Sequence, residues 1–191
     1  MGNYPQSVGL GAYNLKKRVW GRVVAEAAER LSKRPEAILI LGLGGGTEAH
    51  LFAERFPGVV IDGVEIDPAI IEVGRRFFEL SKIPNLRVIT ADAADVCCHP
   101  ERFNLSAQRY PLVVFDAYIG DEVSQGVNDL VGLRGISKLL LPEGIAIFNW
   151  LSKRQPQKFR EKLENVFDKV EEVGIVHGWG LPPGNILFLC Q

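Results

Sequence analysis

The sequence predicts an α/β fold in which one seven-stranded sheet lies between two layers of helices. Residues 37–67 read as an apolar strand, a glycine-rich turn, a helix and a second apolar strand, which is the pattern of a β-α-β unit. Further apolar runs of strand length alternate with helical patterns up to residue 168. The last two runs, 170–176 and 185–190, have no helix between them and must pair antiparallel, because a parallel crossover needs about a dozen residues or more. Five parallel strands and a C-terminal antiparallel pair therefore make up the expected α/β/α sandwich.

Length and composition are those of one ordinary globular domain. The 191 residues are 47% hydrophobic and 24% charged, and the net charge is −1. This balance does not indicate binding to nucleic acid or to an anionic membrane, and no apolar run is long enough to span a bilayer. Three cysteines, two of them adjacent, make a poor disulfide framework, which favours a reducing, cytoplasmic location. We expect residues 1–12 to be a flexible arm and residues 13–191 to form the single domain.

The first helical pattern runs from Tyr13 to about Leu31, with basic residues near its start. We expect an amphipathic helix that covers the sheet; a second interpretation makes its N-terminal part, including Tyr13, a lid over a ligand site. Proline, glycine and asparagine then mark the ends of the later elements. The expected strands are 37–41, 59–65, 86–90, 112–115, 145–150, 170–176 and 185–190, and the expected helices are 47–56, 68 to before 84, 127–141 and 153–168.

The glycine turn after the first strand indicates a nucleoside-bearing cofactor. Glycines let the backbone approach a ligand at the start of a helix, and Glu65, 19 residues past Gly46, stands where an acid can accept both ribose hydroxyls. The dinucleotide fingerprint would need a small residue in place of Thr47, whereas Gly-x-Gly-x-Gly is common where the ligand is S-adenosylmethionine or a relative. The alternative is that the glycines only pack the helix on the strand. The expected cofactor-binding residues are Gly42, Leu43, Gly44, Gly45, Gly46, Glu65, Ile66, Asp92, Ala93 and Asp116.

Three acids follow closely after predicted strands. Asp67 precedes Pro68 and is expected to cap the next helix. Asp92 can either cap a short helix or accept the adenine amino group, and the neighbouring ribose position of Glu65 favours the adenine contact. Asp116 ends the fourth strand near the topological switch point of the sheet, so we expect it to take part in the chemistry. The alternative for Asp116 is a solvated loop acid or a helix cap.

The run Cys97-Cys98-His99 could suggest a metal site. Adjacent cysteines lack the Cys-x-x-Cys spacing of zinc sites, and the sequence offers no second pair of ligands. We therefore expect no metal, and expect these residues to finish a helix near Pro100.

The order of elements resembles that of the class I S-adenosylmethionine-dependent methyltransferases, which have a Rossmann-like fold. Within that fold the chain most resembles the spermidine synthases and their relatives, over residues 37–190. The resemblance implies that Glu65 binds the ribose, that Asp92 binds the adenine end, and that Asp116 is the catalytic carboxylate that helps to deprotonate or orient an attacking amine. It rests on Ile40, on Val64-Glu65-Ile66-Asp67 followed by Ile71-Glu72-Val73, and on Pro183-Gly184-Asn185-Ile186-Leu187-Phe188-Leu189-Cys190.

The sequence departs from the spermidine synthases at three points. Gly45 stands where that family carries an acid that meets the aminopropyl end of its cofactor. The family's Asp-Ser-Ser-Asp is replaced by Asp116-Ala117-Tyr118-Ile119, and the next acid, Asp121, is displaced by two positions. The small N-terminal β-domain that usually precedes the fold is absent from this sequence. Because a diamine carries two positive charges that must be desolvated, the loss of two carboxylates disfavours polyamine synthesis.

These observations lead to three functional hypotheses. The first is a methyltransferase that uses S-adenosylmethionine, with Asp116 as base or orienter and Tyr118 shaping the acceptor pocket. The second is an aminopropyltransferase that uses decarboxylated S-adenosylmethionine, with Asp121 standing in for the missing acid. The third is a non-catalytic nucleoside-binding or scaffold protein. The expected acceptor is a small molecule, with an amine as one candidate; a homodimer stays open, and neither nucleic acid nor membrane is expected as a partner.

Overall fold

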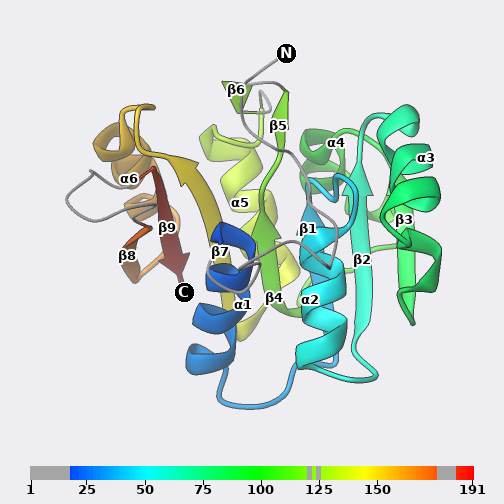
Figure 1. Cartoon of the computed structure of the whole chain (residues 1–191). Coiled ribbons are helices and arrows are strands. Elements are labelled where there is room, and N and C mark those ends of the chain that lie inside the picture. The colour runs from blue at the N-terminus through cyan, green and yellow to red at the C-terminus, as the bar shows by residue number, and fades with distance from the viewer. Residues whose placement is uncertain (1–17, 120–121, 124–125, 176–183) are drawn as a thin grey trace.

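The computed structural model describes residues 18–119, 122–123, 126–175 and 184–191. These residues form a seven-stranded sheet with helices on both of its faces (Figure 1), which confirms the predicted α/β/α sandwich. The strands of this sheet are β1 (Ala37–Leu41), β2 (Val60–Glu65), β3 (Leu86–Thr90), β4 (Tyr110–Phe115), β7 (Leu140–Leu151), β8 (Val170–Ile175) and β9 (Asn185–Cys190). The helices are α1 (Val19–Arg30), α2 (Thr47–Arg55), α3 (Pro68–Phe77), α4 (Ala93–Cys98), α5 (Leu130–Leu139) and α6 (Pro156–Glu164), with short 3-10 turns at Leu80–Lys82 and Pro100–Phe103.

The strand order is β3-β2-β1-β4-β7-β9-β8. Strands β3, β2, β1, β4 and β7 pair in parallel, so their carboxyl ends meet at one edge of the sheet. The two C-terminal strands pair antiparallel, as predicted, but β9 lies between β7 and β8 and is antiparallel to both. Strand β8 therefore runs in the direction of the first five, and β9 alone is reversed.

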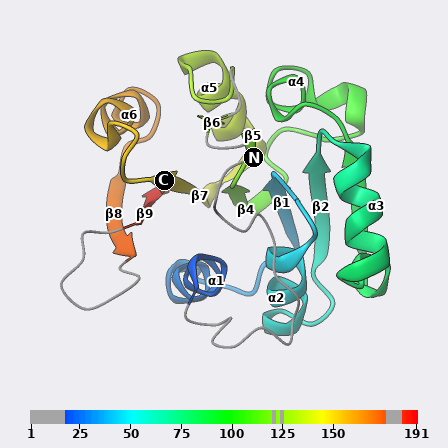
Figure 2. The ribbon, with the colours of Figure 1, turned by 45° about the horizontal axis from the view of Figure 1, so that its top comes forward.

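The central strands bury side chains on both faces. In β1, Ile38 and Ile40 pack on the side of α1 and α2, while Leu39 and Leu41 pack on the side of α4 and α5. Figure 2 shows these two helix layers on opposite sides of the sheet. Strands that are apolar on both faces are characteristic of a parallel sheet between helices. This packed centre fixes the ends of β1, β2 and β4, where the polar site residues follow.

Several element boundaries differ from those predicted, and the largest differences lie at α3, which ends at Phe77, and at α5, β7 and α6. Helix α5 begins only after Asp129, whose carboxylate accepts hydrogen bonds from the backbone N–H groups of Val131 and Gly132, both at 2.9 Å. The chain is extended from Leu140 onward, so β7 starts five residues earlier than expected, with an irregularity opposite the start of β4. Helix α6 is also shorter, because Pro156 occupies its first turn.

One element was not predicted at all. Strands β5 (Tyr118–Ile119) and β6 (Glu122–Val123) form a small antiparallel ladder directly after β4. The expected arm at residues 1–12, the start of the first helix at Tyr13 and the loop at 177–183 lie outside the described residues. Within the described ranges, no helix is both long enough and apolar enough to cross a membrane.

Candidate functional site

The glycine turn between β1 and α2 lies tightly against the ends of two neighbouring strands. The backbone N–H groups of Gly42 and Leu43 both donate to the carbonyl oxygen of Val64, at 3.0 and 2.8 Å. Gly42 has a φ of +97°, and a Cβ placed on it would lie only 2.4 Å from the carbonyl oxygen of Asp116. Only glycine allows this backbone conformation and this close approach together. The strand, turn and helix predicted for this segment are confirmed.

Glu65, at the end of β2, is held by backbone donors on both sides. Its Oε2 accepts from the N–H of Gly44 at 2.8 Å, and its Oε1 accepts from the N–H of Asp67 at 3.1 Å. A carboxylate offers about four acceptor positions, so each oxygen keeps capacity for one further hydrogen bond. The structure therefore fixes a carboxylate beside the glycine turn in a position where it can accept two hydroxyl groups.

Two further strand-end acids, Asp67 and Asp92, cap helices. The Asp67 carboxylate accepts from the N–H of Ala69 at 2.8 Å, so its predicted role as the cap of α3 is confirmed. Asp92 likewise accepts from the N–H of Ala94 at 2.8 Å and caps α4, the interpretation that the sequence had made the second choice. Asp92 also lines a pocket beside the glycine turn, so its contact with adenine stays a prediction. The pocket is lined by Gly42, Val64, Ile66, Ala91, Asp92, Ala93, Ala117 and Tyr118.

Asp116 follows β4 and is partly buried beneath α1. Its Oδ1 accepts from the Asn149 Nδ2 at 2.7 Å, and its Oδ2 accepts from the Trp20 indole Nε1 at 3.3 Å. Burial raises the pKa of Asp116 from 3.8 to about 7, although these two hydrogen bonds act in the opposite direction. A carboxyl group with a pKa near neutrality is suited to accept a proton from a substrate.

Asn149 connects this acid to the neighbouring strands. It is only 4% exposed, and its Oδ1 accepts from the Asn185 Nδ2 at 2.8 Å. The hydroxyl of Tyr118 donates to the backbone carbonyl of Asn149 at 2.5 Å. Burial, followed by the charge of Asp116, raises the pKa of Tyr118, so its hydroxyl stays protonated. Tyr118 therefore lines the pocket, and its hydroxyl group is already bonded to the backbone of β7.

Glu48, in the first turn of α2, is a site residue that the sequence analysis missed. It is 4% exposed, and among the described residues neither of its carboxylate oxygens has a hydrogen-bond partner. Burial raises the pKa of Glu48, and the nearby charge of Asp116 raises it further. The two acids line one small cavity of about 30 Å³ together with Trp20 and Thr47. An acid near a helix N-terminus is common, so nothing in the sequence distinguishes Glu48.

The remaining predicted residues fall around this centre. Ala93 is buried in the first turn of α4, and Ile66 is 48% exposed at the mouth of the pocket beside Asp92. Gly45, in the glycine turn, lies against α3, where its Cα would be 3.4 Å from a Cβ placed on Gly74. Asp121 lies outside the described residues. No group of three metal-ligating side chains occurs in the part of the chain that the structure describes.

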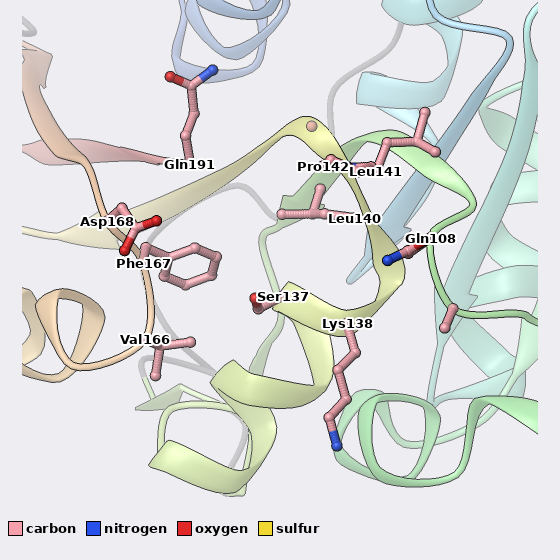
Figure 3. Close-up of a pocket in the computed structure, with 12 residues that line it drawn as sticks. Gln108, Ser137, Lys138, Leu140, Leu141, Pro142, Val166, Phe167, Asp168 and Gln191 are labelled. Carbon is pink, nitrogen blue, oxygen red and sulfur yellow. The ribbon is translucent and has the colours of Figure 1, made fainter.

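A larger cavity, of about 430 Å³, lies at the opposite edge of the sheet. Figure 3 shows it between the end of α5, the start of β7 and the segment around Phe167. Among the described residues that line it, Lys138 and Asp168 have charged side chains. Ligands of open α/β sheets bind beyond the carboxyl ends of the parallel strands, and this cavity is at their amino ends. The smaller pockets around Asp116 are therefore the candidate site.

Searches of curated sequences find relatives of two kinds, whereas no family model matches the chain. A polyamine aminopropyltransferase of Vibrio vulnificus is 34% identical over 62% of this chain and 39% of its own length. A second, from Chromobacterium violaceum, is 30% identical over 75% of this chain and 54% of its own length. The human eEF1A lysine and N-terminal methyltransferase is 29% identical over 70% of this chain and 20% of its own length. The chain thus spans between a fifth and about half of these relatives.

The solved structures agree with the sequence relatives. Human methyltransferase-like protein 13, in complex with SAH, superposes with a TM-score of 0.72 at 25% identity, covering 94% of this chain and 82% of that one. A probable spermidine synthase from Corynebacterium glutamicum superposes with a TM-score of 0.75 at 19% identity, over 100% of this chain and 67% of that one. The chain therefore has the class I S-adenosylmethionine-dependent methyltransferase fold, and aminopropyltransferases and eEF1A methyltransferases are its relatives within that fold.

Proposed function

We propose that this chain is an S-adenosylmethionine-dependent transferase that methylates a small-molecule acceptor. The observation that carries the proposal is Asp116, a carboxyl group beside the glycine turn whose pKa of about 7 is matched to proton transfer near neutral pH. The relatives support a transferase, since one kind transfers aminopropyl groups and the other methyl groups by their names. Glu65 supports the nucleoside part, because its carboxylate is fixed by two backbone donors and can still accept hydroxyl groups.

The residues of the chain would divide the work as follows. Glu65 would bind the ribose, Asp92 and Ile66 would border the adenine, and the glycine turn would lie along the rest of the cofactor. The sulfonium of the bound cofactor supplies an electrophilic carbon. The protein then has to hold the acceptor in line and take up its proton. Asp116, oriented by Asn149 and Trp20, is placed to accept that proton on a carboxylate oxygen.

Aminopropyl transfer from decarboxylated S-adenosylmethionine is the second candidate. The sequence disfavoured aminopropyl transfer because Gly45 and Ile119 stand where the spermidine synthases carry acids. Glu48 changes this balance, because it brings a second buried carboxyl group to the cavity that Asp116 lines. A pocket with two carboxyl groups can offset the desolvation of a charged amine. An amine acceptor, whether methylated or aminopropylated, is accordingly the acceptor class that we favour.

The experiment that tests the proposal is calorimetric titration of the protein with S-adenosylmethionine and, separately, with its decarboxylated form. Preference for the carboxylated ligand supports methyl transfer, and preference for the decarboxylated one supports aminopropyl transfer. If neither binds, the cofactor argument is wrong. If one binds but no acceptor is ever modified, the chain is a nucleoside-binding or scaffold protein.

Variants of Asp116 test its catalytic role. Asp116→Asn should reduce turnover at least about a hundredfold, because a general base contributes to the reaction step, and should leave the affinity for 5′-methylthioadenosine, which lacks the amino group of the cofactor tail, within about threefold. Asp168→Asn, an exposed acid at the opposite edge of the sheet, is the matched control and should change neither. Full activity of Asp116→Asn would remove this residue from the mechanism.

Several expectations remain proposals of this kind. We propose a single domain over residues 13–191, a cytoplasmic location and a homodimer as a possible assembly, with no nucleic-acid partner. The near-zero net charge of −1 and the absence of an apolar spanning helix in the described ranges are compatible with these proposals. Gel filtration with light scattering would test the homodimer directly.

A further inference from the structure

Glu48 has no structural role that the fold explains. Its carboxylate is almost fully buried, and no described side chain or backbone group donates a hydrogen bond to it. Buried carboxyl groups are nearly always paired, because an unpaired one loses the hydration that it has in the unfolded chain. A leucine or methionine at this position of α2 would fold more favourably. Such a residue indicates a ligand whose polar group completes the site.

The cavity beside Glu48 limits the size of the ligand group that can bind there. Its volume is about 30 Å³, and besides Glu48 and Asp116 it is lined by the glycine turn from Gly42 to Gly44, by Trp20 and by Thr47. A space of this size accommodates roughly one water-sized group. A primary ammonium head, –NH₃⁺, is about as large as a water molecule and carries three donors and no acceptor.

The charged residues around the cavity indicate the charge of the ligand group that can bind there. Of the described residues that line it, Glu48 and Asp116 are the ones that ionise, and none is basic. Tyr118 is the further titratable group that faces Asp116, while Trp20 and Asn149 are neutral donors to Asp116 alone. Two carboxyl groups without a cation between them repel one another, so the pair retains a proton. A ligand that brings one positive charge relieves this repulsion.

We infer that Glu48 and Asp116 together bind one primary ammonium group of a ligand that lies along the glycine turn. This inference rests on the proposed function, because the ligand is either the amino group in the tail of the adenosyl cofactor or the amino group of the acceptor. Three ammonium hydrogens can be shared between four carboxylate oxygens, which satisfies Glu48 and leaves the Asn149 and Trp20 contacts of Asp116 in place. As the ammonium group binds, the proton retained by the pair is released to solvent.

The experiment compares ligands with and without the amino group on the wild type and on Glu48→Gln. The probes are S-adenosylmethionine and its decarboxylated form, which carry an aliphatic amino group in the tail, and 5′-methylthioadenosine, which has the adenosine and the sulfur but lacks that tail amino group. Butylamine, titrated into protein saturated with 5′-methylthioadenosine, represents the acceptor. Glu54→Gln, an exposed acid on the same helix, is the matched control. Circular dichroism and the unchanged affinity for 5′-methylthioadenosine report that the variants are folded.

We expect Glu48→Gln to weaken the amino-bearing ligand about tenfold or more and to leave 5′-methylthioadenosine within about twofold, because hydrogen bonds between charged partners are the strong ones. If Glu48→Gln weakens the binding of the two cofactors, the ammonium group belongs to the cofactor tail. If it weakens the binding of butylamine, the ammonium group belongs to the acceptor. Titration in two buffers of different ionisation enthalpy should show proton release on binding by the wild type, and less by Glu48→Gln.

Two results separate failure of this inference from failure of the proposed function. If Glu48→Gln binds every probe as the wild type does, the ammonium site is refuted while the cofactor proposal stands. If no adenosyl compound binds the wild type, the proposed function fails, and butylamine titrated into the unliganded protein still decides whether the pair binds an amine. Absence of butylamine binding in that case refutes the inference as well.

Discussion

Replacing Gly42 by alanine tests whether the glycine turn and the end of β4 are as tightly packed as the structure shows. The added Cβ would lie 2.4 Å from the carbonyl oxygen of Asp116 and 2.7 Å from the Cα of Ala117. Both neighbours are backbone atoms of the chain directly after β4, so neither can move aside as a side chain would. The turn or the end of β4 has to shift, and Asp116 shifts with it.

The magnitude follows from three contributions. An L-residue at a φ of +97° loses about 1–2 kcal/mol relative to glycine. The lower entropy of the unfolded chain returns about 0.4–1 kcal/mol. Overpacking against backbone destabilises by a further ~1–3 kcal/mol. Together these contributions predict that Gly42→Ala lowers the free energy of unfolding by about 3 kcal/mol, within a range of ~1–5 kcal/mol.

Gly58→Ala is the matched control. Gly58 has a similar φ of +87°, but its added Cβ would meet only the end of the Arg34 side chain, at 3.2 Å. This variant should lose about 1 kcal/mol or less, because the conformational terms remain and the side chain can move. Urea denaturation followed by tryptophan fluorescence measures both variants, and calorimetry with the adenosyl ligand should show weaker binding only for Gly42→Ala. Equal loss of stability in the two variants would refute the close packing against β4.

Three other predictions follow from the acids. Activity, as kcat/KM, should rise through about pH 7 as Asp116 ionises to its base form, and this limb should vanish from the residual activity of Asp116→Asn. Because the pKa of Glu48 is raised on folding, the folded protein keeps the Glu48 proton at a pH where the unfolded chain has lost it, and the free energy of unfolding falls as pH rises above 4.5. Glu48→Gln should therefore stabilise the fold, and urea denaturation should show a larger gain at pH 8 than at pH 5. Asp62 is 1% exposed and accepts from the Arg87 Nε at 2.6 Å, so Asp62→Asn should lower the free energy of unfolding by about 3 kcal/mol, whereas Glu72→Gln, in an exposed pair, should lower it by under about 0.5 kcal/mol. Similar losses in the two variants would contradict the burial of the Asp62 carboxylate.

Features that depend on neighbours along the chain could be predicted from the sequence. Hydrophobic periodicity predicted the strand, glycine turn, helix and strand of residues 37–67, because each element shows its own repeat. The Asp67-Pro68 pair predicted the start of α3, since a cap is a contact over two residues. The loop without a helix between β8 and β9 predicted their antiparallel pairing. Local patterns left Asp92 open, because a cap and a ligand contact have the same sequence signature; the structure shows the cap, and the adenine contact stays a prediction.

Which polar groups meet at the site depends on long-range packing and could not be predicted from the sequence. Trp20 and Asn149, which bond to Asp116, are 96 and 33 residues away from it in the sequence, and no local pattern links them. Glu48 reads as an ordinary acid of a first helical turn until packing under α1 removes it from water. Burial and charge proximity depend on which elements pack together, and that is set by the sum of many long-range contacts. The sequence could therefore place Asp116 at the end of a strand, but the raised pKa of this acid and its pairing with Glu48 exist only in the folded chain.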